Sequence, residues 1–278
     1  MTDKSLWQTG VGNAWAQSWQ ATDRSFAGLT SRFLDLLESL PGRTVLDIGC
    51  GAGELSLALA RRWPEAKIIG VDVSPDLIEA ARARAGDYSS AEFELADAAV
   101  WTKAGFAPDL LVSRHGVMFF DDPAGAFTHL FDLAAPSARL AFTCFRWRQE
   151  NPWIFGLAET VLAENVPGLA PGSDSSEPGP FAFADPERVT GILSAAGWSG
   201  IRIEPIDFAY VTGAGDDPVA NARQFFARIG PMAPILRELE GELRDAVERR
   251  LDAWLRKNTH DGLVAFPAAA WQVTARKG

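Results

Sequence analysis

A glycine-rich turn between a short apolar run and an amphipathic segment constrains the fold of this chain most. Residues 45–63 read VLDIGCGAGELSLALARRW, with glycines at positions 49, 51 and 53. A strand, a tight turn and a helix N-terminus together form a site where backbone N–H groups point at a ligand. Glycine has no Cβ atom that would block a close approach. The stretch therefore predicts a strand-turn-helix unit that binds a ligand at its turn.

Apolar runs and helical patterns alternate on both sides of this turn. Strands are predicted at 44–48, 67–72, 92–95, 109–113 and 138–145, with helices over 54–63 and 75–85 and a further helix from Pro123. Pro64 ends the first helix, and Ser74 with Pro75 forms an N-cap and first helical position. With two later strands, the alternation predicts an α/β fold, a Rossmann-like seven-stranded and mainly parallel sheet with helices on both faces.

The regular alternation stops after Phe145. Residues 146–184 form a long connection that contains GLAPGSDSSEPGP, and such a connection is typical of a lid or a disordered segment. A helix over 185–196, a strand over 201–208, a helical stretch over 217–257 and a final strand over 264–277 follow, with Pro267 predicting a bend or an unpaired edge. We interpret 1–278 as a single domain. Its core is expected at 43–145, 185–210 and 262–276, and its helical lid segments at 1–40, 146–184 and 211–261.

Composition limits the partners and the location of the protein. The formal net charge of −10 would repel nucleic-acid phosphates. Two cysteines are too few for a disulfide framework and lack the spacing of metal ligands. The N-terminus, MTDKSLWQTG, has no apolar core of a signal peptide, and no apolar run is long enough to span a bilayer. We expect a cytoplasmic protein that acts on a small molecule, without nucleic acid or membrane insertion, and in an oligomeric state that the sequence does not predict.

Acidic residues around the turn indicate which ligand it binds. Asp72 ends the second predicted strand, where a carboxylate binds both hydroxyls of a ribose, so the ligand should contain a nucleoside. A dinucleotide fold expects a third small residue where this chain has Glu54, whose carboxylate would repel a pyrophosphate. The Glu54 carboxylate and Asp47 together favour a cationic ligand, and they count against a nicotinamide oxidoreductase. The alternative is a turn that only packs a helix on the sheet, with Asp72 solvated.

Several segments resemble class I S-adenosylmethionine-dependent methyltransferases. VLDIGCGAG resembles their first motif, GVDVSPDLIEAARAR their second-strand segment, LADAA their third and SARLAFTCF their fifth strand. SRHGVMFFDDPAGAF, ENPW, GPFAFADPERV and VAFPAAAWQVTAR are similar to a small-molecule branch related to quinone-biosynthesis methyltransferases. The similarity covers nearly the whole chain and implies S-adenosylmethionine as the cofactor. It leaves the substrate open, because this fold hosts many functions.

The resemblance implies roles for individual residues at the cofactor site. The methionine part would lie along the glycine turn, the ribose on the acidic end of the second strand, and the adenine against the third. Cys50 sits inside the turn as a small packing residue, Arg114 would pair with the cofactor carboxylate, and Asp97 has a helix N-cap as its alternative role. The expected cofactor-binding residues are Asp47, Gly49, Cys50, Gly51, Asp72, Val73, Asp97, Ala98, Ser113 and Arg114.

Residues for the methyl acceptor are predicted from position and aromatic content. His115 follows the fourth strand and is the candidate general base, or equally a pocket wall, since close relatives typically have an aromatic residue there. Asp121 and Asp122 are interpreted as a helix cap, and no metal site is expected. Aromatic residues outside the core predict a closed, apolar pocket, although each could be a core residue instead. The candidate substrate-binding residues are Trp7, Trp15, Trp19, His115, Phe119, Trp147 and Trp153.

The sequence thus predicts methyl transfer from S-adenosylmethionine to a small hydrophobic or aromatic acceptor. The acceptor atom, which could be oxygen, nitrogen, sulfur or carbon, stays open. The alternatives are a protein that binds the cofactor or its product without transferring methyl, and a methyltransferase that acts on a peptide.

Overall fold

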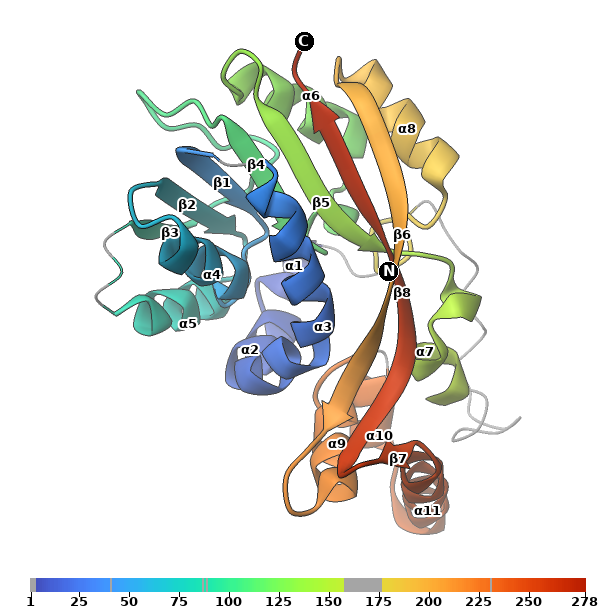
Figure 1. The fold of residues 1–278 in the computed structure, drawn as a ribbon. Helices are drawn as coiled ribbons and strands as arrows, with labels where there is room; N and C mark the ends of the chain where they lie inside the picture. Colours follow the sequence, from blue (N-terminus) through green and yellow to red (C-terminus); the bar gives the residue numbers. More distant parts are fainter. Residues whose placement is uncertain (1–3, 41, 87, 89, 158–176, 231) are drawn as a thin grey trace.

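The structure, a computed structural model, describes residues 4–40, 42–86, 88, 90–157, 177–230 and 232–278 (Figure 1). The strands are β1 (Thr44–Ile48), β2 (Lys67–Asp72), β3 (Ala91–Leu95), β4 (Leu110–Arg114), β5 (Arg139–Phe145), β6 (Ser199–Gly213), β7 (Thr259–His260) and β8 (Leu263–Arg276). The helices are α1 (Lys4–Trp7), α2 (Gly10–Gln17), α3 (Trp19–Glu38), α4 (Glu54–Arg62), α5 (Pro75–Ala85), α6 (Pro123–Leu133), α7 (Pro152–Leu157), α8 (Pro186–Ala195), α9 (Pro218–Phe226), α10 (Met232–Glu238) and α11 (Gly241–Lys257). Short 3-10 helices cover Val117–Phe119 and Arg148–Glu150.

The strands form one sheet in the order β3-β2-β1-β4-β5-β8-β6, and β7 pairs with β8 as an eighth strand. Neighbouring strands from β3 to β5 are parallel, whereas β8 is antiparallel to both β5 and β6. The prediction of a mainly parallel, Rossmann-like sheet is therefore confirmed, with the two-residue β7 added to the seven predicted strands. The strand order reverses between β1 and β4, and α/β sheets bind ligands beyond the carboxyl ends of the strands at such a point.

Helices cover both faces of the sheet because each inner strand is apolar on both sides. Val45 packs with α4 and α5, while its neighbour Leu46 packs with α6 on the opposite face. Successive side chains of a strand point to opposite faces, so a strand buried on both sides is a continuous apolar run. The N-terminal ends of α5 and α6 are capped by Ser74 and Asp122, each followed by a proline, as predicted.

Helix α3 is buried against the sheet, within the segment 1–40 that the sequence predicts to be a lid segment. Phe33 and Leu37 are fully buried in a cluster with α4 and strand residues, and Phe26 contacts the Phe208 and Tyr210 rings of β6. Buried positions recur from Thr22 to Leu37 of this helix, at the spacing of one helical face. Helices α1 and α2 are less buried than α3, with no buried residue described in α1 and only Gly12 in α2.

Strands β6 and β8 form a long antiparallel pair that extends past the end of β5 (Figure 1). Pairing between β5 and β8 ends at Phe145 and Ala270, so Pro267 lies where only the β6 side of β8 is paired. The predicted unpaired edge at Pro267 is confirmed. Helices α9 and α11 pack at this end of the β6/β8 pair, where Trp254 stacks on Phe266.

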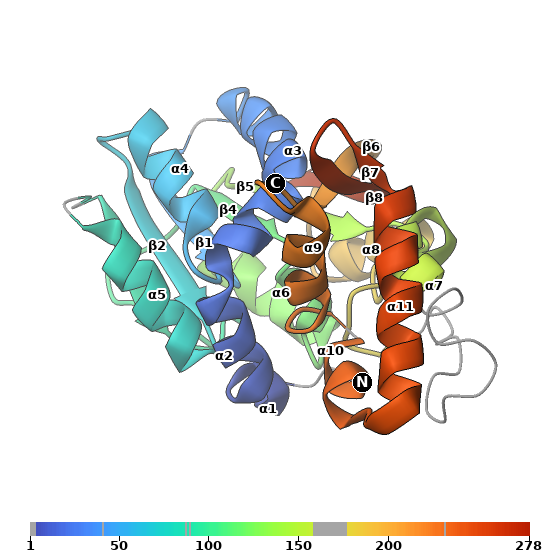
Figure 2. The same cartoon turned by 90° about the horizontal axis from the view of Figure 1, so that it is seen from below.

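Helices α1 and α2 approach the carboxyl ends of β2 and β3. A Cβ atom at Gly12 would collide with the side chain of Ser74, so this contact between α2 and the start of α5 requires glycine. Figure 2 shows α1 and α2 between the α4 and α5 side of the molecule and the side that carries α9 to α11. Residues 158–176, part of the predicted lid segment 146–184, lie outside the described residues. Among the described residues, no helix is both long and apolar enough to cross a lipid bilayer.

Candidate functional site

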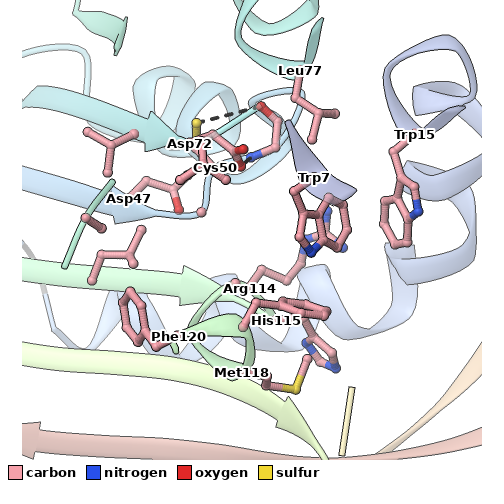
Figure 3. Close-up of a pocket in the computed structure, with 18 of the residues that line it drawn as sticks. Trp7, Trp15, Asp47, Cys50, Asp72, Leu77, Arg114, His115, Met118 and Phe120 are labelled. Carbon is pink, nitrogen blue, oxygen red and sulfur yellow. Dashed lines mark hydrogen bonds between the residues drawn. The ribbon is translucent and has the colours of Figure 1, made fainter. Parts of the chain in front are cut away.

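A cavity of about 560 Å³ lies beyond the carboxyl ends of β1, β2 and β4 (Figure 3). Its volume falls within the range of small-molecule sites. The glycine turn and Asp72 line one part, and aromatic side chains from α1, α2, α3, β5, α7 and β6 line the rest. The cavity therefore joins the predicted nucleoside site to an apolar compartment.

The glycine turn needs glycine for two separate reasons. Gly49, Gly51 and Gly53 all have positive φ, at 64°, 55° and 82°. A Cβ atom at Gly49 would lie 2.9 Å from the Gly116 Cα, whereas one at Gly51 would have no protein atom within 4 Å. Position 49 therefore serves close packing of the chain, and position 51 faces the open cavity.

Asp72 is held by the backbone of the turn itself. Its side chain is buried, and its two carboxylate oxygens accept hydrogen bonds from the Gly51 and Ser74 N–H groups, each at 2.9 Å. Burial raises the pKa of this carboxyl above its usual value. A carboxylate oxygen can accept more than one hydrogen bond, so Asp72 retains capacity for hydroxyl groups in the cavity.

Asp47 lies below the turn at the end of β1. Its carboxylate is 1% exposed and accepts a 2.6 Å hydrogen bond from the Ser56 hydroxyl. Burial raises the pKa of Asp47 to about 6, while the Ser56 bond and the Arg114 charge oppose that rise. An acid with this pKa changes its charge near neutral pH.

Glu54 and Arg114 form an ion pair across the cavity mouth. Arg114 Nη2 lies 2.8 Å from Glu54 Oε2, and the Arg114 guanidinium lies over the Phe26 ring at 4.7 Å. The buried Arg114 Nε has no hydrogen-bond partner in the protein. This pairing gives Glu54 a role that the sequence did not predict, and the free Nε is a donor that a bound carboxylate could use.

A second acid, Asp23 of α3, stands beside this pair. Arg84 Nη2 lies 2.5 Å from Asp23 Oδ2, but burial and the nearby Glu54 charge raise the pKa of Asp23 to about 6. Burial and a like charge both disfavour the ionised carboxylate, which explains the direction.

Asp97 and Ala98 lie where the resemblance puts the adenine. Asp97 Oδ1 accepts a 3.0 Å hydrogen bond from the Ala99 N–H, and Asp97 Oδ2 accepts one from Lys4 Nζ at 2.5 Å. The Lys4 bond lowers the pKa of Asp97. No helix begins here among the described residues, so Asp97 caps a turn. Lys4 ties α1 to this end of the cavity, where Val73 also lies.

Cys50 lines the cavity as a buried packing residue. Its N–H donates a 3.0 Å hydrogen bond to the Val71 carbonyl, and burial raises the pKa of its thiol well above the usual range. A neutral buried thiol behaves as a small apolar group, in line with the packing role predicted for Cys50.

Ser113 does not reach the cavity. Its hydroxyl donates to the Ile48 carbonyl at 2.7 Å and accepts from the Gly116 N–H at 3.1 Å. It is fully buried and joins the end of β1 to the turn after β4. The predicted direct contact with the methionine end is therefore replaced by a supporting one.

His115 lies at the boundary between the two parts of the cavity. Its Nδ1 is 2.8 Å from Thr143 Oγ1, and its buried Nε2 has no partner in the protein. The Phe145 and Phe26 rings lie 4.2 Å and 5.3 Å from the imidazole, centre to centre. Burial, followed by the Arg114 charge, holds the pKa of His115 well below its usual value, so the ring is neutral at physiological pH.

The apolar compartment of the cavity is built largely from aromatic rings in contact with one another. Trp153 stacks on Tyr210 with ring centres 4.4 Å apart and also contacts Phe145. Phe26 lies against Phe145 and Tyr210. Trp7 contacts both Trp15 and Phe119 on the α1 side. An apolar, aromatic compartment is present, as expected from the sequence.

Two of the predicted substrate-binding residues lie elsewhere. The Trp19 ring lies 3.9 Å under the Arg84 guanidinium, outside the cavity lining, and Trp147 packs against the apolar core. Trp7, Trp15, His115, Phe119 and Trp153 do line it. Position in the sequence could not separate the lining residues from the other two, because Trp19 and Trp147 are close in the chain to Trp15 and Trp153.

Other lining residues were not among the candidates predicted from the sequence. Phe26 and Tyr210 belong to the aromatic segments expected to cover the site, but they carried no individual assignment. The lining also includes Phe145, Lys4, Asp23 and Met118, for which the sequence held no separate signal. Asp122 accepts a 3.0 Å hydrogen bond from the Gly125 N–H, which confirms its predicted cap.

The charged lining of the cavity is mainly acidic. Lys4 and Arg114 are its two cations among the described residues, and each is ion-paired, with Asp97 and Glu54 respectively. Its acids are Asp23, Asp47, Glu54, Asp72, Asp97, Asp121 and Asp122. In the part of the chain that the structure describes, no three His, Cys, Asp or Glu side chains are grouped so that they could hold a metal ion. The charge balance suits a cationic ligand.

Comparisons with known proteins agree with this geometry. Residues 45–137 match a family model described as a methyltransferase domain. A demethylmenaquinone methyltransferase of Thermus thermophilus is 31% identical over 198 residues, which cover 67% of this chain and 88% of that enzyme. A trans-aconitate 2-methyltransferase of Methylobacterium radiotolerans is 41% identical over 99 residues, 36% of each chain. The match thus spans about a third of the length of that enzyme.

The fold comparison extends over more of the chain. A Haemonchus contortus phosphoethanolamine N-methyltransferase, solved with phosphomonomethylethanolamine and S-adenosylhomocysteine, has a TM-score of 0.54 at 16% identity. The alignment covers 94% of this chain and 57% of that one. At this identity the likeness concerns the fold alone.

Proposed function

Because this chain belongs to the class I S-adenosylmethionine-dependent methyltransferases, we propose that it transfers a methyl group from S-adenosylmethionine to a small aromatic or hydrophobic acceptor without carboxylate or phosphate groups. One observation carries the proposal. The glycine turn and the aromatic compartment line the same cavity, and the two cations that the described residues contribute to it are already paired.

The residues present fit the cofactor. The open space over Gly51 accommodates backbone approach of a ligand, Asp72 keeps acceptor capacity for ribose hydroxyls, and the partnerless Arg114 Nε can donate to a carboxylate. When bound, S-adenosylmethionine supplies a methyl group that a nucleophile can attack, because the positively charged sulfur that carries it is a good leaving group. Asp47 and the paired Glu54 place negative charge near such a cation.

The chain itself contributes alignment and exclusion of water. Trp153, Tyr210 and Phe145 form a wall against which a flat acceptor can lie, and α1 closes over the cofactor end through Lys4. Holding two reactants in a fixed geometry is a large source of rate enhancement in group transfer. The wall lacks a free cation among the described residues, which disfavours a tricarboxylate such as trans-aconitate.

Cofactor binding is tested by calorimetry with S-adenosylmethionine. We expect Asp72→Ala to lower the affinity by about a hundredfold, close to 2.8 kcal/mol. Asp216→Ala is the matched control, because Asp216 is exposed and outside the cavity lining. Undiminished affinity of Asp72→Ala would mean that the ribose lies elsewhere.

Methyl transfer is tested by mass detection of S-adenosylhomocysteine formed with a panel of acceptors. We expect turnover with phenols or hydroxynaphthoquinones and none with trans-aconitate. Cofactor binding without product in any arm would support the alternative of a binding protein. Turnover with trans-aconitate would contradict the proposed acceptor class. The cytoplasmic location, the absence of a nucleic-acid partner and the division into core and lid segments stay predictions.

A further inference from the structure

Thr143 and His115 form a buried pair between β5 and the end of β4. His115 Nδ1 lies 2.8 Å from Thr143 Oγ1, and the His115 backbone N–H donates a 3.1 Å hydrogen bond to the Thr143 carbonyl. Thr143 is fully buried, and His115 is 7% exposed. The pair therefore has only protein groups and the cavity for hydrogen-bond partners.

The hydrogen bonds of Thr143 decide which ring nitrogen carries the proton. The imidazole is neutral, so one nitrogen is a donor and the other an acceptor. Among the described residues, the Thr143 hydroxyl has no hydrogen-bond partner besides His115 Nδ1. If Nδ1 carried the proton, the buried Thr143 hydroxyl hydrogen would have no acceptor, which is costly. If Thr143 donates to Nδ1, that hydrogen is satisfied and the ring proton resides on Nε2.

The ring is also held in place by its surroundings. His115 has a φ of 64°, an uncommon value for a residue other than glycine, and a backbone in this region costs about 1–3 kcal/mol. The other two such residues among those described, Ser137 and Asp261, are exposed. Phe145 packs edge-on against the imidazole. With Nδ1 turned to β5, the partnerless Nε2 is left for the cavity that His115 lines (Figure 3).

We propose that His115 binds the methyl acceptor as a neutral hydrogen-bond donor through Nε2–H, and that Thr143 is a positioning residue that selects this tautomer. The ligand group is an oxygen that only accepts hydrogen bonds, as ketone, enolate and phenolate oxygens do. The imidazole keeps its proton, so this assignment replaces the general base expected from the sequence. The nature of the ligand rests on the proposed function, whereas the tautomer does not.

Nitrogen NMR tests the tautomer without any turnover. The chain has three histidines, so a histidine-labelled sample gives few ring signals, and His115→Phe identifies those of His115. We expect the shift of a protonated nitrogen at Nε2 and of an unprotonated nitrogen at Nδ1. The reverse pattern would overturn the proposal.

Variants of Thr143 separate positioning from mere support of the fold. Thr143→Val removes the donor and should convert His115 wholly or partly to the Nδ1–H tautomer, whereas Thr143→Ser should retain the wild-type pattern. Thr212→Val is the matched control, because Thr212 is a fully buried β6 residue whose hydroxyl donates to the Val264 carbonyl. An unchanged pattern in Thr143→Val would contradict the positioning role.

Two small probes of similar shape test the direction of the hydrogen bond. Tetralone offers only a carbonyl acceptor, and tetrahydroquinoline offers an N–H donor beside the same kind of ring. Quenching of tryptophan fluorescence should show tetralone binding about fivefold more tightly, the worth of one neutral hydrogen bond. His115→Phe should abolish the preference. A preference for tetrahydroquinoline, or none, in the wild-type protein would overturn the donor assignment.

These outcomes are distinguishable from failure of the proposed function. A protein that binds the cofactor without transferring methyl would still show the Nε2–H tautomer and the probe preference. A methyltransferase with the opposite tautomer would lose the donor assignment alone.

Discussion

The two parts of the cavity are assembled in different ways. The part that we propose for the cofactor, called the cofactor part, comes from consecutive turns after β1, β2 and β3, and its polar groups are largely backbone atoms and carboxylates near them in the chain. The part that we propose for the methyl acceptor, called the acceptor part, brings together rings from α3, β5, α7 and β6, as far apart as Phe26 and Tyr210. A site made from one local turn can be recognised from sequence, whereas a site made from packed rings depends on the whole fold.

The largest expected effect tests the backbone character of the cofactor part. Gly51→Ala places a methyl group in the open cavity at a φ of 55°, so we expect cofactor affinity to fall by about a hundredfold, near 2.8 kcal/mol. Gly105→Ala is the matched control, because Gly105 also has positive φ and open space but lies outside the cavity lining. Calorimetry of cofactor binding and thermal unfolding would measure the two effects separately.

If Gly51→Ala and Gly105→Ala lose equal stability and only Gly51→Ala loses cofactor affinity, the result would support backbone contact of Gly51 with the cofactor. Normal cofactor binding by Gly51→Ala would show that the turn does not approach the ligand. The contrast between a cofactor part made of backbone and an acceptor part made of rings would then be wrong.

The acceptor part is tested by its stacked ring pair. Trp153→Leu removes the ring that stacks on Tyr210, and we expect the acceptor KM to rise about thirtyfold, equivalent to a loss of about 2 kcal/mol at a buried aromatic contact. Cofactor affinity should be unchanged, because Trp153 belongs to the acceptor part. Steady-state kinetics with the acceptor found in the panel would measure the effect.

Trp254→Leu controls for the loss of a buried tryptophan. Trp254 is stacked on Phe266 to a similar degree, but it does not line the cavity. We expect both variants to lower the melting temperature and only Trp153→Leu to raise KM. An equal rise of the acceptor KM in Trp153→Leu and Trp254→Leu would mean that the effect comes from lower stability of the fold.

The pH dependence of cofactor binding should come from the buried carboxyl groups of the cavity. Burial raises the pKa of Asp47 to about 6, and a cationic ligand favours its ionised form. Affinity for S-adenosylmethionine should therefore rise with pH through about 6, by up to about tenfold between pH 5 and 7.5. Asp23, with a pKa of about 6, and Asp72, whose pKa is also raised, would act in the same direction.

Asp47→Asn assigns the dependence to one residue. Calorimetry at several pH values should give a flatter profile for the variant, whatever its absolute affinity. A profile as steep as that of the wild-type protein would assign the titration to Asp23 or Asp72 instead. His115 should not contribute near neutral pH, because its pKa is held well below the usual range.

The same contrast explains what the sequence could predict. The spacing of glycines and Asp72 predicted the turn and its partner, since both depend on a few neighbouring residues. The family resemblance implied a cofactor contact for Ser113, but its hydroxyl donates its hydrogen bond to the Ile48 carbonyl. Trp19 and Trp147 were assigned to the pocket by composition, and only packing could show that they point elsewhere.

Burial patterns also hid the acceptor residues of the core. Phe26 lies on a helical face of α3 that packs on the sheet, and nothing in that pattern separates a ring that lines a cavity from one that fills the core. The pairing of Glu54 with Arg114 likewise depends on where α4 starts relative to the end of β4. The mainly parallel sheet, in contrast, followed from alternation alone.

The smallest expected effect concerns the link between α1 and the cofactor part. Lys4 and Asp97 form a partly exposed ion pair, and such pairs contribute about 0.5 kcal/mol. Lys4→Met should therefore weaken cofactor binding about twofold, mainly through faster dissociation as α1 separates from the turn.

Lys103→Met is the matched control, because Lys103 pairs with Glu92 and Glu94 outside the cavity lining. Stopped-flow dissociation at low and high salt would measure the effect, and the difference should shrink at high salt because exposed charges are screened. A loss of affinity that does not depend on salt would mean that α1 is held over the cavity by the ring contacts of Trp7. In that case the aromatic acceptor part, and not the ion pair, would keep α1 in place.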